Sequence, residues 1–478
     1  MHRSDGDPPR RFPATAVAVT GSQLHVFTAV ARPLHHRAPS RTSPGTATMA
    51  ASGLRIVRRR SPVMTHPQHH TAVAADPSAD PATADTIVAP PLRARQLRIA
   101  VVGGSLTGPV LALLLLQAGF EQIAVYEANP DLATATGGIL SLEHPALDVL
   151  DRLGIARHEY VQFGFETITQ FRGYGPADDR FVQRQYPGRF TTWTLLHQAL
   201  ARRLPDGLVH AGRRVTGISA EHRRPVLHFT DGRRAWADLV AFCDGRASIG
   251  RRLLDPDRRL HYAGYVAHRG TATTRPADLA DFQRWEPRPG LQFTIAPVPA
   301  GSDWIFALNA TTEQYTTWFG ARPEQRTFVL PHHVNPAARA HVDAHAAAHL
   351  PAHLADLVHA TGPRMAVPVL DIDPPTTMAW PVGDGHAVLL GDALAPVRAH
   401  TARGANNGIE QADGLVTALR QHTRHGADLT GALTGWRRRH LLTALEAVRQ
   451  GPIIAARLGL GTGLAQSISR DLVTALPG

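Results

Sequence analysis

The stretch LRIAVVGGSLTGPVLALLLLQAGFEQIAVYE, residues 97–127, has the pattern of a strand, a helix and a second strand. Its first apolar run, 97–102, ends in two glycines and predicts a buried strand. Pro109 lies near the first turn of a helix whose residues 110–117 are apolar almost all round. Residues 122–127 predict the second strand. A unit of about 30 residues is the size of a parallel, right-handed βαβ crossover, so we expect an α/β protein.

The turn between the first strand and the helix carries the pattern of a dinucleotide-binding loop. Gly103, Ser105 and Gly108 occupy the three glycine positions of GxGxxG, which serve a tight turn, a close approach to a diphosphate, and helix–strand packing. The diphosphate is expected at the N-terminus of the helix, and Glu127 can accept hydrogen bonds from ribose hydroxyls. This motif alone does not separate NAD from FAD, and a structural glycine turn is the alternative. The predicted cofactor-binding residues here are Gly103, Gly104, Ser105, Leu106, Thr107, Gly108 and Glu127.

Two further motifs follow predicted strands. The strand AVLLG, 387–391, leads into GDALAPVRAHTARGANNGIEQA, 391–412, which brings Asp392 to the carboxyl end of a strand, where open α/β sheets bind ligands. A long helix is expected to begin near Gly404. The strand 238–243 leads into CDGRASIGR, 243–251, in which Asp244 and Gly245 could also form only a tight turn.

With these three motifs in this order, the sequence resembles the FAD-dependent aromatic hydroxylases, the family typified by para-hydroxybenzoate hydroxylase. The resemblance extends from residue 97 to about residue 420. Four short segments are similar to the branch of the family that includes 2,6-dihydroxypyridine hydroxylase. They are GGSLTG, TTWTLLHQAL (191–200), YAGYVAHRG (262–270) and RAHTARGAN (398–406). The chain departs from the family in GDALAP, in Ala399, and in lacking an arginine near Thr192 that helps hold FAD in many relatives.

The resemblance implies roles for the second and third motifs. Gly391 and Asp392 would bind the ribityl chain of FAD, and Asp244 would contact FAD and serve NAD(P)H use. Gly404, Ala405 and Asn406 would lie under the pyrimidine edge of the flavin. The dipole of the helix that begins there would stabilise negative charge on reduced flavin.

The implied activity is monooxygenation. NADH or NADPH reduces FAD, O2 forms a flavin C4a-hydroperoxide, and a small aromatic substrate attacks it; the protein positions the partners, excludes water and helps remove a phenolic proton. Tyr265 and His268 lie on the strand that faces the ring in the family, although alternation places them on opposite faces, so one of them is expected in the pocket. Core packing is the alternative for each. His400, inside the flavin loop, is a third catalytic candidate, as a substrate contact or a support.

Other functions fit parts of the pattern. A dehydrogenase, an epoxidase or a ring-opening oxygenase could use the same fold, and a flavin-binding protein without turnover is conceivable. A plain NAD-dependent dehydrogenase would leave the GD segment unexplained. A flavin halogenase is disfavoured because that family relies on a lysine, and all 50 basic residues of this chain are arginine.

Composition excludes several other classes. Residues 1–96 contain 12 Arg and 5 Asp and so hold +7 of the net charge of +11. The small charge left for the rest of the chain argues against nucleic-acid binding there. The single cysteine, Cys243, excludes an internal disulfide and suits the cytoplasm. No apolar run is long enough to span a membrane. His341, His345, His349 and His353 repeat every four residues, but Pro351 interrupts them and a solvated helix is preferred to a metal site.

We therefore expect a doubly wound FAD-binding domain with glutathione-reductase-like Rossmann topology, an inserted mixed β-sheet substrate domain, and C-terminal helices, in a monomer or homodimer. Residues 1–95, rich in Pro, Ala, Thr and Arg, are predicted to be a disordered leader. The predicted segments are 96–175, 191–256 and 376–425 for the FAD-binding domain, 176–190 and 257–375 for the substrate domain, and 426–478 for the C-terminal helices.

Overall fold

The computed structural model describes part of the chain, as two separate units, residues 1–84 and 85–478. The described residues are 19–20, 23–24, 96–131, 137–164, 166–173, 181–426 and 428–461. In the first unit, β1 (Val19–Thr20) pairs with β2 (Gln23–Leu24) in an antiparallel ladder. The disorder expected for the rest of 1–95 concerns residues outside those described, and the description of the second unit begins at Gln96.

The second unit contains a six-stranded sheet in the order β19-β20-β13-β3-β4-β9. Its strands run parallel except for the edge strand β19. The predicted βαβ unit is confirmed, although helix α1 begins at Thr107, so that Pro109 lies inside its first turn. The bounds are β3 (Ile99–Val102), α1 (Thr107–Gln117), β4 (Ile123–Tyr126), β9 (Val209–His210), β13 (Leu239–Phe242), β19 (Ala379–Val382) and β20 (Gly385–Leu389).

The register of this sheet aligns the three motifs. Val102 pairs with Phe242, and Phe242 pairs with Leu389, so β3, β13 and β20 end side by side. These apolar strands are buried on both faces, as parallel strands covered by helices should be. The loops that follow them, with Gly103, Asp244 and Asp392, therefore leave the same edge of the sheet.

Smaller elements complete this half of the unit. A three-stranded meander contains a hairpin turn at Asp231-Gly232, a dipeptide typical of such turns. Helix α3 runs from Trp193 to Ala201. The bounds are β5 (Ile139–Glu143), α2 (His144–Arg152), η2 (Arg157–Glu159), β8 (Gly188–Thr192), α3 (Trp193–Ala201), β10 (Val215–Glu221), β11 (Arg224–Phe229), β12 (Arg234–Trp236) and α4 (Ile249–Leu254).

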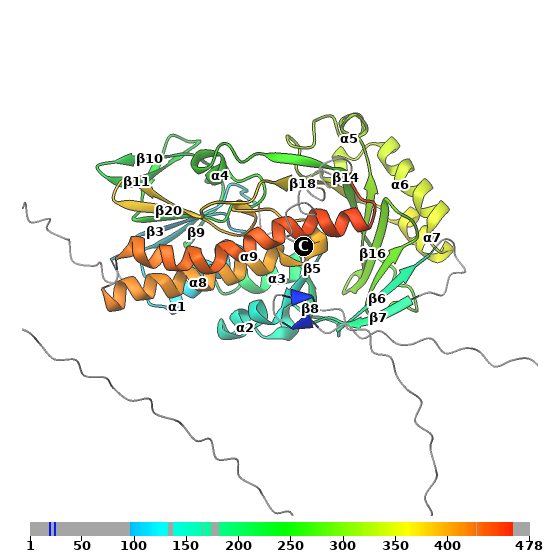
Figure 1. Ribbon diagram of the computed structural model, residues 1–478, viewed down its shortest axis with the longest axis horizontal. Coiled ribbons are helices and arrows are strands. Elements are labelled where there is room, and N and C mark those ends of the chain that lie inside the picture. The colour runs from blue at the N-terminus through cyan, green and yellow to red at the C-terminus, as the bar shows by residue number, and fades with distance from the viewer. Residues whose placement is uncertain are drawn as a thin grey trace, which may run out of the picture. The chain divides into compact units, whose positions relative to one another are not determined.

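A seven-stranded mixed sheet forms the other half, in the order β18-β14-β17-β16-β15-β6-β7. Neighbouring strands are antiparallel except β15 and β6. Helices α5, α6 and α7 lie along one side of it (Figure 1). The bounds are β6 (Thr167–Arg172), β7 (Phe181–Gln185), β14 (Leu260–Ala272), β15 (Phe282–Glu286), β16 (Leu291–Val298), β17 (Gly301–Asn309), α5 (Thr312–Phe319), η3 (Pro331–His333), α6 (Pro336–His349), α7 (Ala352–Ala360) and β18 (Arg364–Ile372).

The two faces of the mixed sheet differ in chemistry. Phe293, Trp304 and Phe306 pack against α6 and α7 on the helix-covered face. Because side chains alternate along a strand, their neighbours Thr294 and Asp303 point to the opposite face. That second face carries polar residues, and it is the face from which Asp303 accepts a hydrogen bond from the Ile139 N–H of β5 at 2.9 Å.

Two long helices end the described chain and run side by side (Figure 1). The predicted helix near Gly404 is α8 (Arg403–His425), and the predicted C-terminal helix is α9 (Leu429–Arg457). The Trp436 indole N–H donates to the Gln411 carbonyl at 2.9 Å and fixes α9 on α8. The end of α9 brings Ala455 and Leu460 against β14 of the mixed sheet.

Three expectations concern features outside the core. Helix α6 ends at His349 and α7 begins at Ala352, so Pro351 does interrupt the histidine series. The described residues contain no cluster of side chains suited to a metal ion. They also contain no helix that is long and apolar enough to cross a membrane.

The boundary of the substrate domain is proposed anew. Because β6 belongs to the mixed sheet, we propose that the substrate-domain segment begins near residue 166 and not at 176.

Candidate active site

The loop after β3 has the geometry of a tight, crowded turn. Gly103 has φ of +107°, and a Cβ atom there would lie 2.5 Å from the Cys243 carbonyl oxygen. A Cβ atom on Gly108 would collide with the Gly103 carbonyl. Both positions therefore require glycine, for conformation at the first and for close helix–strand packing at the second.

Glu127 lies beside this loop. Its carboxylate accepts hydrogen bonds from the Gly104 and Asn129 N–H groups, each at 2.7 Å. The acid thus sits at the end of the strand next to the loop, where the ribose of a dinucleotide would lie in the expected arrangement. The indole N–H of Trp193 donates to the Ser105 hydroxyl at 2.9 Å, so α3 also holds the loop.

The GD segment contacts the same loop. Gly391 has φ of +57°, and a Cβ atom there would lie 3.0 Å from Thr107 Oγ1 and 3.3 Å from the Gly408 Cα of α8. The Gly391 N–H donates to Gln411 Oε1 at 2.7 Å. The first and second motifs, separated by nearly 300 positions in the chain, therefore meet at Thr107 and Gly391.

Asp392 lies in the loop that follows β20 and leads to α8. Among the described residues no group donates a hydrogen bond to its carboxylate. Burial raises its pKa, and the positive charges of Arg246 and Arg251 oppose that rise. A Cβ atom on Gly404 would lie 3.6 Å from Asp392 Oδ1, so the carboxylate stands at the N-terminus of α8. A largely buried carboxylate in this state calls for hydroxyl donors from a ligand.

The first turn of α8 offers N–H groups to the same place. A helix leaves the N–H groups of its first turn without intrahelical acceptors, and α8 begins at Arg403. The N–H groups of Gly404 and Ala405 are thus available to an anionic or carbonyl edge. The Asn406 side chain instead accepts from the Glu143 N–H at 2.8 Å and donates to the Ser141 carbonyl at 3.1 Å, which fixes α8 on β5.

The third motif joins the other two. Asp244 accepts from the Ser248 hydroxyl at 2.5 Å and the Ile249 N–H at 2.7 Å, so its carboxylate is used to begin α4. Burial raises its pKa, and these hydrogen bonds lower it. Arg251 donates to the Asp392 and Ala393 carbonyls at 3.1 and 2.8 Å. The DG motif therefore supports the GD segment through Arg251.

Tyr265 and His400 meet between the mixed sheet and the GD segment. The Tyr265 hydroxyl lies 3.1 Å from His400 Nε2. Burial, Arg284 and Arg398 together lower the pKa of His400 to about 3, so the imidazole is neutral. Burial raises the pKa of Tyr265, so its hydroxyl stays protonated. Arg398 lies 5.4 Å from the centre of the Tyr265 ring and is paired with Asp371 through its Nε, at 2.7 Å.

Comparisons with known proteins agree with this geometry. Residues 96–446 match the family described as FAD binding domain. The 3-amino-4-hydroxybenzoate 2-monooxygenase of Streptomyces cremeus is 30% identical over 342 residues, which are 68% of this chain and 79% of that protein. The chain belongs to the FAD-dependent aromatic hydroxylase family. The predicted family, monooxygenase class and FAD cofactor are confirmed.

Further relatives of this monooxygenase are informative. The 6-hydroxynicotinate 3-monooxygenase of Pseudomonas fluorescens is 28% identical over 70% of this chain and 86% of its own. The solved 2,6-dihydroxypyridine-3-hydroxylase of Arthrobacter nicotinovorans covers 78% of this chain with a TM-score of 0.65 at 22% identity. A salicylate hydroxylase substrate complex covers 79% with a TM-score of 0.60 at 19% identity. These likenesses confirm the predicted α/β fold.

The structure places His268 away from the other candidates. Its ring faces Trp318 and Phe319 of α5, at centroid distances of 6.3 and 6.4 Å, on the helix-covered face of the sheet. Burial and neighbouring positive charge lower its pKa to about 3. Tyr265 points to the other face of the sheet, as the alternation predicted. The position of His268 against α5 favours a role in core packing over a place in the substrate pocket.

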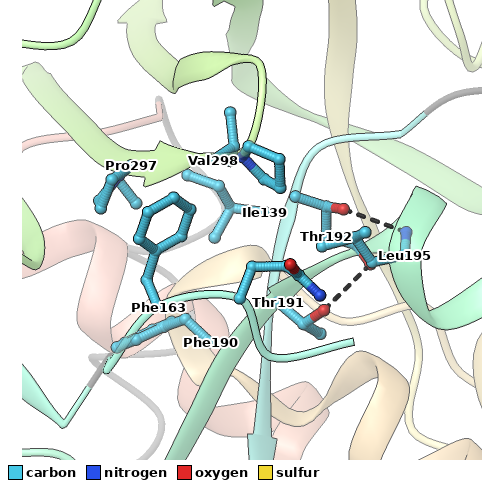
Figure 2. Close-up of a pocket in the computed structure, with 11 residues that line it drawn as sticks. Ile139, Phe163, Phe190, Thr191, Thr192, Leu195, Pro297 and Val298 are labelled. Carbon is cyan, nitrogen blue, oxygen red and sulfur yellow. Dashed lines mark hydrogen bonds between the residues drawn. The ribbon is translucent and has the colours of Figure 1, made fainter. Parts of the chain in front are cut away.

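A small apolar pocket of the monooxygenase lies between the β5–β8 pair and the end of β16. Phe163, Phe190 and Ile139 face Pro297 and Val298 across it, and Thr192 caps α3 at its margin by accepting from the Leu195 N–H (Figure 2). Phe190 stacks on Phe282 of β15 with ring centroids 4.6 Å apart. The pocket therefore adjoins the polar face of the mixed sheet.

Sequence reasoning missed three residues of this monooxygenase. Trp193 directly follows Thr192, near which the arginine of many relatives is missing, and the motif TTW carried that signal. Arg398 lies within the quoted GD segment, but its pairing with Asp371 depends on β18. Arg284 gave no signal, because its strand FQRWE could have faced either way.

Proposed function

We propose that this monooxygenase hydroxylates a small, hydroxylated aromatic or heteroaromatic ring with O2 and either NADH or NADPH. The observation that carries the proposal is the Tyr265–His400 pair, which adjoins both the GD segment and the polar face of the mixed sheet. Relatives are named for 3-amino-4-hydroxybenzoate and 6-hydroxynicotinate, two ring acids that carry a hydroxyl group.

The residues present fit FAD. The turn from Gly103 to Gly108 would hold the diphosphate, with Glu127 at the ribose. Asp392 would accept from ribityl hydroxyls, and the N–H groups of Gly404 and Ala405 would face the pyrimidine edge. When bound, FAD would accept two electrons from the nicotinamide and activate O2.

Tyr265 and His400 would move the phenolic proton. An imidazole with so low a pKa does not deprotonate a resting phenol, but the hydroxyl becomes strongly acidic as its ring is attacked. The Tyr265 oxygen would then take the proton of the substrate hydroxyl, while His400 Nε2 accepts the Tyr265 proton. Losing the proton at this stage lowers the barrier to oxygen transfer. Arg398 and Asp371 hold the loop that carries His400 against β18.

The surroundings of Tyr265 exclude water. Its side chain is 1% exposed and packs against Ala263, Ala307, Ala455 and Leu460. Apolar cover of this kind limits hydrolysis and loss of reactive oxygen to solvent. The end of α9 thus belongs to the working site.

The test uses the purified FAD-loaded chain. NADH and NADPH oxidation would be measured with 4-hydroxybenzoate, 3-amino-4-hydroxybenzoate and 6-hydroxynicotinate, under ¹⁸O2, with mass analysis of products. We expect at least one substrate to accelerate oxidation and to gain a single ¹⁸O atom. A yellow protein without stimulation across a broad phenol and pyridine panel would favour a non-catalytic flavin-binding protein. A colourless protein that binds NAD would favour a dehydrogenase.

The role of Tyr265 is tested by Tyr265→Phe. This change removes the hydroxyl that meets His400 and keeps the buried ring. We expect kcat for hydroxylation to fall about 100-fold, within the range of general acid–base contributions, with unchanged flavin content. The loss should shrink toward high pH, where the substrate ionises without help. An unchanged kcat and pH profile would remove Tyr265 from the proton path.

We also propose a cytoplasmic enzyme that acts as a monomer or homodimer and has no nucleic-acid or membrane partner. The one cysteine, Cys243, is buried at the end of β13, and burial raises its pKa, which suits a packing residue. Size-exclusion chromatography with light scattering would distinguish the two oligomeric states.

A further inference from the structure

Arg284 occupies the middle of the polar face of the mixed sheet. It pairs with Thr294 of β16 and with Gln170 of β6. Its neighbour Trp285 pairs with Phe293 and packs toward the α6–α7 core. Because side chains alternate along β15, the guanidinium points to the face that turns away from these helices.

Among the described residues no carboxylate lies within ion-pair distance of Arg284, although the charge of Glu286 acts on it. Glu286, two residues along on the same face, accepts instead from Gln170 at 2.6 Å, Gln292 at 3.0 Å and Arg172 at 3.2 Å. Within the described ranges, no acidic side chain forms an ion pair with Arg284, and its buried Nε has no hydrogen-bond partner. A guanidinium held in this way is costly unless an anion joins it.

The surroundings connect Arg284 with the active site. Its positive charge contributes to the lowered pKa of His400, which bonds to Tyr265. On the other side, Phe282 of the same strand stacks on Phe190, at the apolar pocket of Figure 2. A cation, an apolar wall and a proton acceptor thus border one face.

We propose that Arg284 binds the carboxylate of an aromatic acid and so selects ring acids as substrates. The planar fork of the guanidinium matches a carboxylate in two parallel hydrogen bonds. The anchored carboxylate would leave the ring hydroxyl to Tyr265 and His400. This inference rests on the proposed hydroxylase function and narrows its substrate class.

The experiment measures binding to the FAD-loaded enzyme through the change in flavin absorbance. The probes are matched pairs, 4-hydroxybenzoate with 4-hydroxybenzamide and 6-hydroxynicotinate with 6-hydroxynicotinamide. In the wild type, at least one acid should bind about 10- to 100-fold more tightly than its amide, as expected for charge-assisted hydrogen bonds. Arg284→Gln should remove that preference by weakening the acid alone, and Arg284→Lys should keep part of it.

Arg288→Gln is the matched control. Arg288 is exposed just beyond β15, and its charge acts on His345 and His349 of α6, on the other side of the sheet. This variant loses the same charge and should retain the acid preference of the wild type.

Two results would overturn the role of Arg284. In one, no acid of the panel binds the wild type more tightly than its amide, which decides the matter even if the variants do not fold. In the other, Arg284→Gln weakens acid and amide equally. A yellow enzyme that hydroxylates neutral phenols and ignores acids would reject Arg284 and retain the hydroxylase function. A chain that binds no FAD would reject the function itself.

Discussion

At the scale of single residues, the groups that lack internal partners point to the ligands. The Asp392 carboxylate and the Arg284 Nε are both buried to a large extent, and the described protein offers neither a hydrogen bond. Asp244 and Asn406, which the sequence also placed at the cofactor, use their side chains to begin α4 and to hold β5. We therefore propose a binding role for Asp392 and Arg284 and a positioning role for Asp244 and Asn406.

Replacing Asp392 tests the first of these groups. Asp392→Ala removes the acceptor for ribityl hydroxyls, and we expect FAD affinity to fall about 10- to 100-fold, as for hydrogen bonds to a charged group. Flavin fluorescence titration of apoprotein measures the Kd. Asp413→Asn, which alters an exposed ion pair between α8 and Arg152 of α2, should leave the Kd unchanged. Equal affinity in Asp392→Ala would show that the carboxylate does not touch FAD.

Trp193 is expected to support the cofactor through the loop. Trp193→Phe removes the hydrogen bond to Ser105 and retains an aromatic ring beside His197. A net hydrogen bond is worth about 1 kcal/mol, so we expect FAD to bind about fivefold more weakly. The same titration measures this change. Unaltered FAD binding would limit Trp193 to packing of α3.

At the scale of elements, adjacent parallel strands bring the motifs together. The ends of β3, β13 and β20 share one register, so loops far apart in the chain meet at Thr107 and Gly391. Helix α8 then aims its N-terminus at Asp392. The close packing depends on glycine at positions where a side chain has no room.

Gly391→Val tests that packing. The backbone at Gly391 is left-handed, which costs a non-glycine residue about 1–2 kcal/mol, and the added Cβ would press on Thr107. We expect a lower Tm and a lower flavin content. Gly435→Ala is the control, since a Cβ there meets nothing within 4 Å in α9 and should stabilise by about 0.5–1 kcal/mol. Wild-type stability in Gly391→Val would contradict the crowded contact.

The sequence predicted these elements well for a physical reason. Apolar runs, glycines and strand-end acids are local signals, so the βαβ unit, the GD segment and the opposite facing of Tyr265 and His268 could be read directly. Which face of a strand packs against a distant element is not a local property of the sequence. Which face of β15 the helices cover, and hence the role of Arg284, depends on the position of α6 and α7, which no short pattern carries.

At the scale of the whole molecule, the two sheets are joined by buried polar contacts and by α9. Asp303 of the mixed sheet bonds to β5, and Arg398 of the GD segment pairs with Asp371 of β18. Helix α9 packs on α8 and ends against Tyr265. The proposed cofactor and substrate sites are thus held within one packed structure. We expect its stability to depend on neutral buried histidines such as His268.

Acid should destabilise this structure. Burial lowers the pKa of His268 from 6.5 to about 3, so the unfolded chain binds more protons between these values. The stabilisation is complete above pH 6.5 and is lost as pH falls, by about 1.4 kcal/mol per pH unit for such a group. His268→Leu should show a smaller fall in Tm between pH 7.5 and 5.5 than the wild type. The exposed His158→Leu should behave as the wild type; an equal fall in all three would contradict the assignment.

The most direct measurement is a crystal structure of the chain with FAD. We predict one FAD per chain, with its diphosphate on the Gly103–Gly108 turn, its ribityl hydroxyls on Asp392, and its pyrimidine edge at the first turn of α8. An FAD that reaches only the Gly103–Gly108 turn or only the GD segment would contradict the shared cofactor site on which the proposed hydroxylation depends. So would an FAD that lies elsewhere on the protein.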